Sequence, residues 1–226
     1  MPSINNPGIK SFVLRSGRMS RAQEKSFDSG GEYLIPYSGV FTDFSRYFGN
    51  DRRLTVEIGF GMGKATADIA EKEAENNYLG IEVFKAGVGK LLWEIEQRSL
   101  SNIRIIQHDA VEVIEKMVSP CSVSAFHIFF PDPWPKKRHH KRRLMQKPFA
   151  QLLASRLMPG AYVYMVSDWE DYADQALEVL SAVPGLENPY NGTFARGISW
   201  RPVTKFEKKG LEKNHPILEI YLVKKQ

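Results

Sequence analysis

The chain has 226 residues, of which 42% are hydrophobic, and a formal net charge of +5. This length allows one sizeable core, and the mildly basic charge favours an anionic partner. A single cysteine, Cys121, excludes an intramolecular disulfide and fits a reducing compartment. No apolar run approaches the roughly 18–20 residues that span a bilayer, and the first residues lack the apolar core of a signal peptide. We therefore expect a soluble, cytoplasmic protein with no membrane partner.

The first 50 residues differ from the rest of the chain. They contain scattered Gly, Ser and Pro, show little periodicity, and carry basic residues at Arg15, Arg18 and Arg21. We expect residues 1–50 to form a flexible basic extension that is partly loose until a partner binds. The regular pattern of residues 51–226 predicts one folded domain.

From residue 54 onward, short apolar runs alternate with segments of helical periodicity. The pattern predicts strands at 54–58, 78–83, 103–107, 123–130 and 162–167, and helices at 64–72, 86–98, 149–157 and 172–180. The third of these helices is expected to stop at Pro159-Gly160. A last strand is expected at 217–223, with a pairing partner near 200–206. Strands that alternate with helices predict an α/β fold with a mostly parallel sheet and helices on both faces.

Acidic residues lie at the ends of four successive predicted strands, at the edge where such a sheet binds ligands. These residues are Glu82, Asp109, Asp132 and Asp168. The same edge carries a glycine loop between the first strand and the first helix. An ordered series of this kind favours a ligand site over acids that simply sit on exposed strand ends.

The glycine loop has the sequence V-E-I-G-F-G-M-G. Gly59, Gly61 and Gly63 let the backbone turn tightly and approach a ligand. Dinucleotide sites prefer G-x-G-x-x-G, whereas the third glycine comes early here. Glu57, just before the loop, disfavours a pyrophosphate but suits a cationic amino group. The alternative is a glycine turn that serves packing alone.

The acidic residues that follow the next two strands extend this interpretation. Glu82 is placed to accept hydrogen bonds from a ribose diol, and Asp109 to meet the amino group of an adenine. A nucleoside that carries an amino acid and no phosphates fits these features. S-adenosylmethionine is such a molecule.

The fourth predicted strand leads into F-F-P-D-P-W-P. Pro131 and Pro133 restrict the backbone, and Pro133 favours an extended Asp132, so that the carboxylate is held in place. Trp134 offers a stacking face for a base, worth about 1–3 kcal/mol in nucleic-acid sites. Methyltransferases that act on amino nitrogens of bases often carry Asp/Asn-Pro-Pro-aromatic here, and P-D-P-W-P looks like a variant of it. The alternative is a proline-rich turn with a capping aspartate.

A basic strip, K-K-R-H-H-K-R-R, follows immediately at residues 136–143. Such runs are usually solvated surface, but the position beside the candidate catalytic loop favours contacts with phosphates. His139 and His140 are flanked by cations that repel a divalent ion, so we expect no metal site there.

These segments, together with G-I-E-V-F-K-A-G-V-G, S-D-W-E-D-Y-A, R-P-V-T-K-F-E-K-K-G and S-F-V-L-R-S-G-R-M-S-R-A-Q, resemble bacterial tRNA (guanine-N7)-methyltransferases over nearly the whole chain. The resemblance implies a Rossmann-like class I S-adenosylmethionine-dependent methyltransferase with a mostly parallel seven-stranded sheet. It also implies methylation of guanine N7 at position 46, in the variable loop of tRNA.

Carried over by motif, the resemblance implies roles for particular residues. The cofactor site would comprise Glu57, Gly59, Gly61, Gly63, Glu82, Asp109 and Asp132, with Asp132 also the catalytic residue. Substrate contacts would come from Lys136, Asp168, Thr204, Lys205, Phe206 and Glu207. RNA contacts would come from Arg138, His139, His140, Lys141, Arg142 and Arg143. Departures from the family pattern occur at Phe84, Ala86, Lys208-Lys209 and Asn214, and most concern the shape of the substrate loop.

Three other functions compete with this prediction. A NAD-dependent oxidoreductase would share the fold, but the glycine spacing and Glu57 argue against it. A non-catalytic RNA-binding subunit would need only the basic strip, and not the acids around the pocket. A methyltransferase acting on another RNA base is the third. No obligatory protein partner is expected, and both a monomer and a homodimer stay open.

Overall fold

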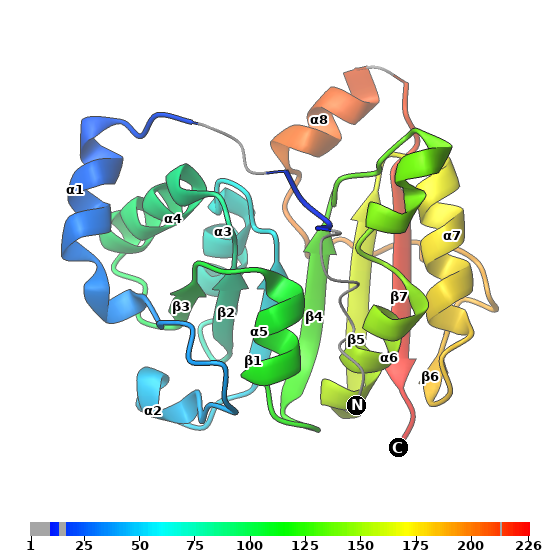
Figure 1. Ribbon diagram of the computed structural model, residues 1–226, viewed down its shortest axis with the longest axis horizontal. Helices are drawn as coiled ribbons and strands as arrows, with labels where there is room; N and C mark the ends of the chain where they lie inside the picture. The colour runs from blue at the N-terminus through cyan, green and yellow to red at the C-terminus, as the bar shows by residue number, and fades with distance from the viewer. Residues whose placement is uncertain (1–9, 14–16, 213) are drawn as a thin grey trace.

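A computed structural model describes residues 10–13, 17–212 and 214–226, apart from the side chains at 205, 206 and 209 (Figure 1). Within these residues, seven strands form one sheet in the order β3-β2-β1-β4-β5-β7-β6. Their bounds are β1 Leu54–Ile58, β2 Asn77–Ile81, β3 Ile103–Ile106, β4 Val123–Phe129, β5 Leu157–Ser167, β6 Leu186–Glu187 and β7 Leu218–Lys224. Strands β1 to β5 pair in parallel, and β7 runs antiparallel to β5 and β6. The predicted mostly parallel, seven-stranded sheet is confirmed.

The central strands are buried on both faces. Every residue of β1 and of β2 is buried, which explains why these strands appear in the sequence as continuous apolar runs and not as alternating patterns. The order of the strands reverses between β1 and β4, because the chain builds β2 and β3 outward on one side and then returns to β4. Ligand sites of open α/β sheets lie at such a switch point.

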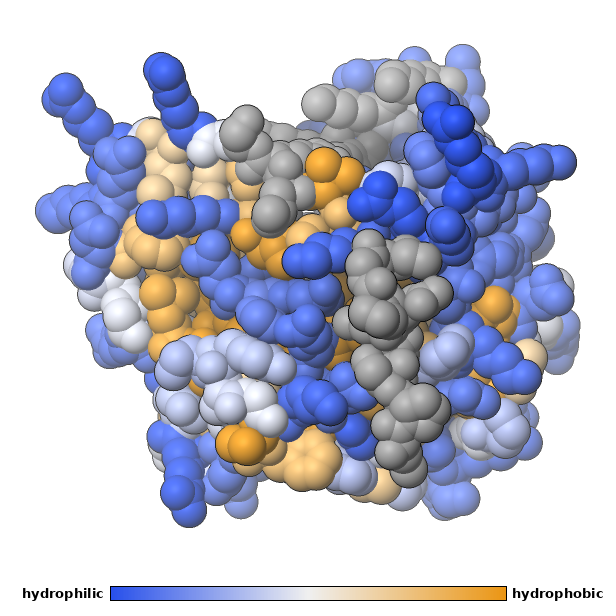
Figure 2. Space-filling model, viewed as in Figure 1, coloured by the Kyte–Doolittle hydropathy of each residue, from blue (hydrophilic) through white to orange (hydrophobic). Residues whose placement is uncertain are grey.

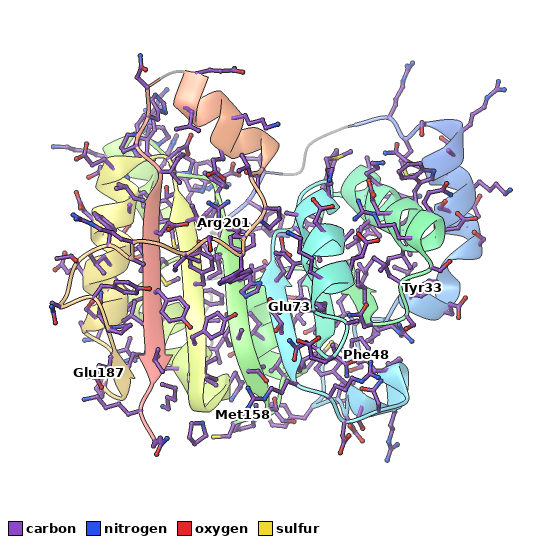
Figure 3. The ribbon with its side chains drawn as sticks, turned by 180° about the vertical axis from the view of Figure 1, so that it is seen from behind. Tyr33, Phe48, Glu73, Met158, Glu187 and Arg201 are labelled. Carbon is purple, nitrogen blue, oxygen red and sulfur yellow. The ribbon has the colours of Figure 1, made fainter. Side chains whose placement is uncertain are left out.

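Helices cover both faces of the sheet, as predicted. One face packs against α5 (Ala110–Lys116), α6 (Lys147–Arg156) and α7 (Glu170–Ser181), and the other against α3 (Lys64–Lys72) and α4 (Lys85–Arg98). Behind β5 and β7, the second face is crossed by the segment that runs from Glu187 to Arg201 (Figure 3). Its Ile198 and Trp200 pack against an aromatic cluster on these strands.

The described part of the first 50 residues is packed on the domain, which differs from the expected loose extension. Helix α1 (Arg21–Ser29) begins with a capping box, in which Ser20 and Gln23 satisfy each other's backbone N–H groups, and it lies against α4. A short 3₁₀ turn, η1 (Gly31–Tyr33), and helix α2 (Ser45–Phe48) follow. Ile35, Phe44 and Phe48 enter the main core. The expected looseness at residues 1–9 and 14–16 lies outside the described residues.

Two local expectations are wrong, and helix α5 (Ala110–Lys116) was not expected. Helix α6 ends at Arg156, and β5 already begins at Leu157, so Pro159-Gly160 belongs to the strand and not to the helix stop. Strand β7 pairs with β5 and β6, whereas the segment near 200–206 is a loop that leads into α8 (Lys205–Glu212). Helix α5 was not predicted, although Asp109 caps it by accepting a hydrogen bond from the backbone N–H of Val111.

Candidate active site

The predicted acidic series and the glycine loop meet at the carboxyl edge of the sheet, around the switch point between β1 and β4. Glu82 follows β2 directly and Asp168 follows β5 directly, whereas Asp109 and Asp132 each lie three residues beyond the ends of β3 and β4. Helix α8 stands above the same edge, and residues 10–13 lie over the tip of β4 (Figure 1). The topology therefore gathers on one edge residues that are far apart in the sequence.

The glycine loop needs glycine for its backbone conformation. Gly59, Gly61 and Gly63 have φ angles of +72°, +59° and +71°, in the left-handed region that other residues rarely adopt. Gly87 in α4 must also be glycine, for a different reason: a Cβ there would lie only 2.0 Å from the carbonyl oxygen of Gly61. The loop is thus a compact turn with the start of α4 pressed against it.

Glu57, in β1, is a buried carboxyl group at the centre of the sheet. Only 3% of the residue is exposed, and its Oε2 has no hydrogen-bond partner among the described residues. Burial raises the pKa of Glu57 to about 7, and the nearby charge of Glu82 acts in the same direction. An incoming cationic group would pair with this carboxylate and offset part of the free-energy cost of burying its negative charge.

Glu82 links β2 to the glycine loop. Its Oε2 accepts a hydrogen bond from the backbone N–H of Gly61 at 2.8 Å, and its Oε1 accepts from the N–H groups of Val83 and Phe84. Carboxylate oxygens have further lone pairs, so the same group can also accept hydrogen bonds from hydroxyls of a ligand. Glu82 fits the predicted cofactor contact and also shapes the loop.

Asp109 lines a small hollow on the β3 side of the edge. Lys10, Phe12, Val83 and His108 are among the other residues that line it. Burial raises the pKa of the Asp109 carboxyl group above its usual value. The hollow lies where the sequence placed an adenine contact, and Phe12 from the N-terminal segment forms part of its wall. This contribution from the N-terminal segment was not predicted.

The loop that carries Asp132 is bounded by two residues in unusual conformations. Phe130 and Trp134 have φ angles of +53° and +47°, which side chains with a Cβ adopt only under strain. Between them, Pro131 and Pro133 flank the half-buried Asp132. Strain of this kind persists where the surroundings over-determine the backbone, and it is common at active sites. The predicted rigid presentation of Asp132 has this backbone basis.

Trp134 has contacts that the sequence did not reveal. Its indole N–H donates to the carbonyl oxygen of Ser11 at 3.1 Å, and the guanidinium carbon of Arg142 lies 4.1 Å from the ring centroid. His139 meets the ring edge-on. One face of the indole is therefore covered by Arg142, and this face does not offer the stacking surface expected for a base.

The basic strip forms a 3₁₀ turn, η2 (Lys137–Arg142), and its residues do not share one environment. The exposed residues are Lys136, Lys137, Arg138 and Lys141; His139, His140 and Arg142 are half-buried; Arg143 is buried. Hydrophilic side chains cover the upper right of Figure 2, where Figure 1 places this segment. The exposed residues of the strip form a positively charged surface, and the buried Arg143 does not belong to that surface.

The predicted substrate segment begins with a capping box. Thr204 accepts a hydrogen bond from the N–H of Glu207 through Oγ1 at 3.1 Å, while Glu207 Oε2 accepts from the N–H of Thr204 at 3.4 Å. The side chains of Lys205 and Phe206 lie outside the described part. The T-x-x-E pattern signals this cap, and the structure assigns it a local role that the sequence analysis missed.

Arg201 is a second residue that the sequence analysis missed. Its side chain is 5% exposed and donates to Glu207 Oε2 at 2.6 Å and to the hydroxyl oxygen of Tyr164 at 3.2 Å. Figure 3, which shows the molecule from behind, places Arg201 at the end of the segment that crosses this face of β5. Glu207 is therefore the acidic partner in a buried ion pair with Arg201.

Asp168 lies at the same edge of the sheet. It packs against Gly210 of α8, and its Oδ2 lies 3.7 Å from His215 Nδ1.

Comparisons with solved structures agree with this fold. The 16S rRNA methyltransferase KamB matches with a TM-score of 0.54 at 13% identity, covering 95% of this chain and 99% of that one. A 30S ribosomal A1408 methyltransferase from an uncultured bacterium matches with a TM-score of 0.51 at 12% identity, covering 81% and 92%. The strand order, the glycine loop and these likenesses define a Rossmann-like class I S-adenosylmethionine-dependent methyltransferase fold.

Sequence comparisons are more specific. A family model described as "Putative methyltransferase" matches residues 51–220. The chain is 49% identical to a tRNA (guanine-N(7)-)-methyltransferase of Nitrosospira multiformis, over 96% of this chain and 95% of that protein. It is also 49% identical to the protein of that name in Paraburkholderia xenovorans, over 99% and 86%. The chain belongs to the bacterial tRNA (guanine-N7)-methyltransferase family.

The residues at the edge fit the cofactor of this family. Glu57 Oε2, which is buried without a hydrogen-bond partner among the described residues, would suit a cationic amino group. No atom of the described residues would lie within 4 Å of a Cβ built at Gly59, so a ligand could approach the loop there. Among the described residues, no group of three or more His, Cys, Asp or Glu side chains is placed to hold a metal ion. Within the same residues, no helix is long and apolar enough to cross a bilayer.

Proposed function

We propose that this protein transfers the methyl group of S-adenosylmethionine to N7 of a guanine in tRNA, at position 46 of the variable loop. The observation that carries the proposal is the carboxyl edge, where the buried Glu57 and the glycine loop adjoin the strained loop of Asp132 and the exposed basic strip. The proteins that share half of this sequence carry the corresponding name. We further propose that the protein acts in the cytoplasm, as a monomer or homodimer, without another protein partner.

Each acidic residue at the edge has a task in this proposal. Glu57 would pair with the amino group of the cofactor, Glu82 would accept from its ribose hydroxyls, and Asp109 would face its adenine. Bound S-adenosylmethionine would supply a methyl group on a positively charged sulfur. The glycine loop would let the backbone approach that ligand without side chains in the way.

Guanine N7 has an in-plane lone pair and no proton, so its methylation needs no base to remove one. The protein would act mainly by aligning the guanine and excluding water. The methylated base is cationic, and the carboxylate of Asp132 would offset positive charge as it develops. Asp132 would therefore position the base and stabilise charge, and would not act as an obligatory general base. Asp168 would accept a hydrogen bond from the guanine edge.

The RNA would be held by the exposed part of the strip. Lys136 would reach the nucleotide that enters the site, and Arg138 and Lys141 would contact phosphates. Contacts of this kind are electrostatic and blind to sequence, so they would hold the tRNA while the pocket selects the base.

The test is incubation of the purified protein with unmodified tRNA and labelled S-adenosylmethionine, followed by mapping of the methylated base. We expect label at N7 of guanine 46, and none in a tRNA that carries adenine there. Transfer to another atom or base would redirect the proposal to a different RNA methyltransferase. RNA binding without any transfer would favour the non-catalytic subunit.

A further inference from the structure

Arg143 ends the basic strip but, unlike the other residues of the strip, it is buried. Its side chain is 1% exposed, whereas Lys136, Arg138 and Lys141 are exposed. A guanidinium that is withdrawn from solvent cannot meet a phosphate without leaving its present contacts. It must therefore be satisfied inside the protein, because an unpaired buried charge is very costly.

The contacts of Arg143 join the catalytic loop to helix α7. Nε donates to the carbonyl oxygen of Pro133 at 2.9 Å, directly after Asp132. Nη1 donates to Gln175 Oε1 at 3.2 Å, and Nη2 donates to Asp171 Oδ2. Arg143 thus holds the loop with one edge of its guanidinium and α7 with the other.

Two further contacts fix the guanidinium in this orientation. Its face lies over the ring of Tyr172, with 5.1 Å from the guanidinium carbon to the ring centroid. Nη2 also donates to His140 Nε2 at 3.1 Å, so that this nitrogen of His140 serves as an acceptor inside the protein. The pKa of the Asp171 carboxyl group is lowered, chiefly by the hydrogen bond from Arg143.

Helix α7 also holds the far end of the strip. Gln175 donates through Nε2 to the carbonyl oxygen of Met145 at 2.7 Å, and the hydroxyl oxygen of Tyr172 accepts from the N–H of Met145 at 3.1 Å. The segment from Pro133 to Met145 is therefore tied to α7 at both ends, while its exposed cations project between the ties. Arg143 supplies the tie nearest to Asp132.

We propose that Arg143 is a positioning residue that sets the place of the Asp132 carboxylate, and that it makes no contact with RNA. The kinetic part of this inference rests on the proposed function. Lysine keeps the charge but cannot direct three donors in one plane, so the Arg143→Lys variant would lose the fork that joins Pro133 to α7.

The proposal is tested with Arg143→Lys in three measurements. We expect kcat to fall about 10- to 100-fold, because a displacement of about 1 Å of a catalytic group has effects of that size. The Kd for tRNA and the slope of log Kd against log salt should equal those of the wild type, also in an Arg143→Gln variant that removes the charge. Amide hydrogen exchange in residues 130–136 should be faster, since the loop has lost its tie.

Two control variants separate positioning from RNA binding and from lost stability. Lys141→Ala removes an exposed cation of the same strip and should lower the salt slope by about one. Arg156→Lys alters another buried arginine, which donates to backbone carbonyls of α5 at the opposite edge of the sheet. It should reduce thermal stability without accelerating exchange in residues 130–136.

The outcomes that overturn the proposal are distinct from failure of the proposed function. If Arg143→Gln, which removes the charge, lowers the salt slope as Lys141→Ala does, Arg143 is an RNA contact whatever happens to kcat. If exchange in residues 130–136 is unchanged, the positioning role is wrong. Wild-type protein without methyl transfer would refute the proposed function, while the salt and exchange measurements still decide the role of Arg143.

Should Arg143→Lys fail to fold, Asp171→Asn takes its place. This substitution weakens the same tie from α7, and the same changes in exchange and kcat are expected.

Discussion

The carboxyl groups at the edge of the sheet differ in environment, and their environments suit them to different roles. Glu57 is buried and has a raised pKa, whereas Asp132 is half-buried on a strained loop beside the basic strip. A buried acid suits recognition of a cationic ligand, and an acid at the rim suits an incoming base. Environment, more than residue type, distinguishes the two.

Replacement of Asp132 by asparagine tests its role in charge stabilisation. The amide keeps the shape and one acceptor oxygen but loses the negative charge that would offset the cationic product. We expect the rate of methyl transfer in a single turnover to fall on the order of 100-fold, with little change in tRNA affinity. A rate close to that of the wild type would show that charge at Asp132 does not matter, and that alignment alone carries the reaction.

The raised pKa of Glu57 makes a prediction about stability against pH. Burial holds the pKa near 7, against 4.5 for the free group. The folded protein therefore keeps the proton that the unfolded chain releases, and the free energy of unfolding falls as pH rises from 4.5 through about 7. From the two pKa values, this loss is on the order of 3 kcal/mol for the ligand-free protein.

The Glu57→Gln variant isolates this contribution, since the amide cannot ionise. Urea unfolding at pH 5 and at pH 8 should show a smaller loss of stability in the variant than in the wild type. The difference between the two losses is the contribution of Glu57, because other titrating groups cancel. Equal losses in both proteins would mean that the carboxyl group ionises normally.

At the scale of elements, α8 shows how a sequence motif can carry a structural meaning beside a functional one. Thr204 and Glu207 form its capping box, and Arg201 holds the same Glu207 carboxylate. The sequence analysis assigned T-K-F-E to substrate contacts by resemblance. The structure adds that Glu207 organises the helix that stands over the site, so its effect on the substrate can be indirect.

Inosine, which lacks the exocyclic amine of guanine, distinguishes the two roles of Glu207. If Glu207 only caps α8 and pairs with Arg201, the Glu207→Gln substitution and inosine at the target position act independently. Their effects on the activation free energy of methyl transfer should then add within about 0.5 kcal/mol. Thr204→Ala, which removes the other half of the cap, should lower stability by about 1 kcal/mol. If Glu207 instead accepts from the amine, the variant should lose little with inosine, and the losses will not add.

The elements that were predicted correctly are those whose signal is local. The buried strands β1 and β4 are short apolar runs, and α3 and α4 have clear helical periodicity, so they appeared near their observed bounds. The partner of β7 could not be found in this way. Residues 200–206 have the composition of a strand, but Arg201 and the capping box direct them into a loop and a helix. The T-x-x-E pattern was a local signal for this helix start, whereas the contact of Arg201 with Tyr164 of β5 could not be found from the sequence.

The same distinction applies to the whole molecule and its site. The alternation of strands and helices predicted the layered architecture, and the acids at strand ends predicted that these side chains gather at one edge of the sheet. Packing of residues 17–50 was missed because it depends on distant partners, such as the hydrogen bond from the N–H of Ile35 to the carbonyl oxygen of Ile105. The burial of Arg143 was missed for a similar reason, since its partners lie on α7.

Cofactor binding should stabilise the whole molecule, because the residues proposed to hold it come from β1, β2 and the turn after β3 and meet only in the folded chain. A ligand that binds the folded state alone at 100 times its Kd adds about 2.7 kcal/mol to the free energy of unfolding. For a domain of this size, that corresponds to a rise in Tm of about 5–10 °C.

Thermal unfolding with S-adenosylmethionine, with S-adenosylhomocysteine and with NAD measures this effect and separates the rival functions. We expect both adenosyl compounds to raise Tm and NAD to have no effect, because Glu57 disfavours a pyrophosphate beside the glycine loop. The Glu57→Gln variant should show a smaller rise with both adenosyl compounds, since both carry the amino group that Glu57 would pair with. A rise with NAD that matches the rise with S-adenosylmethionine would instead support the oxidoreductase and refute the assignment of the edge.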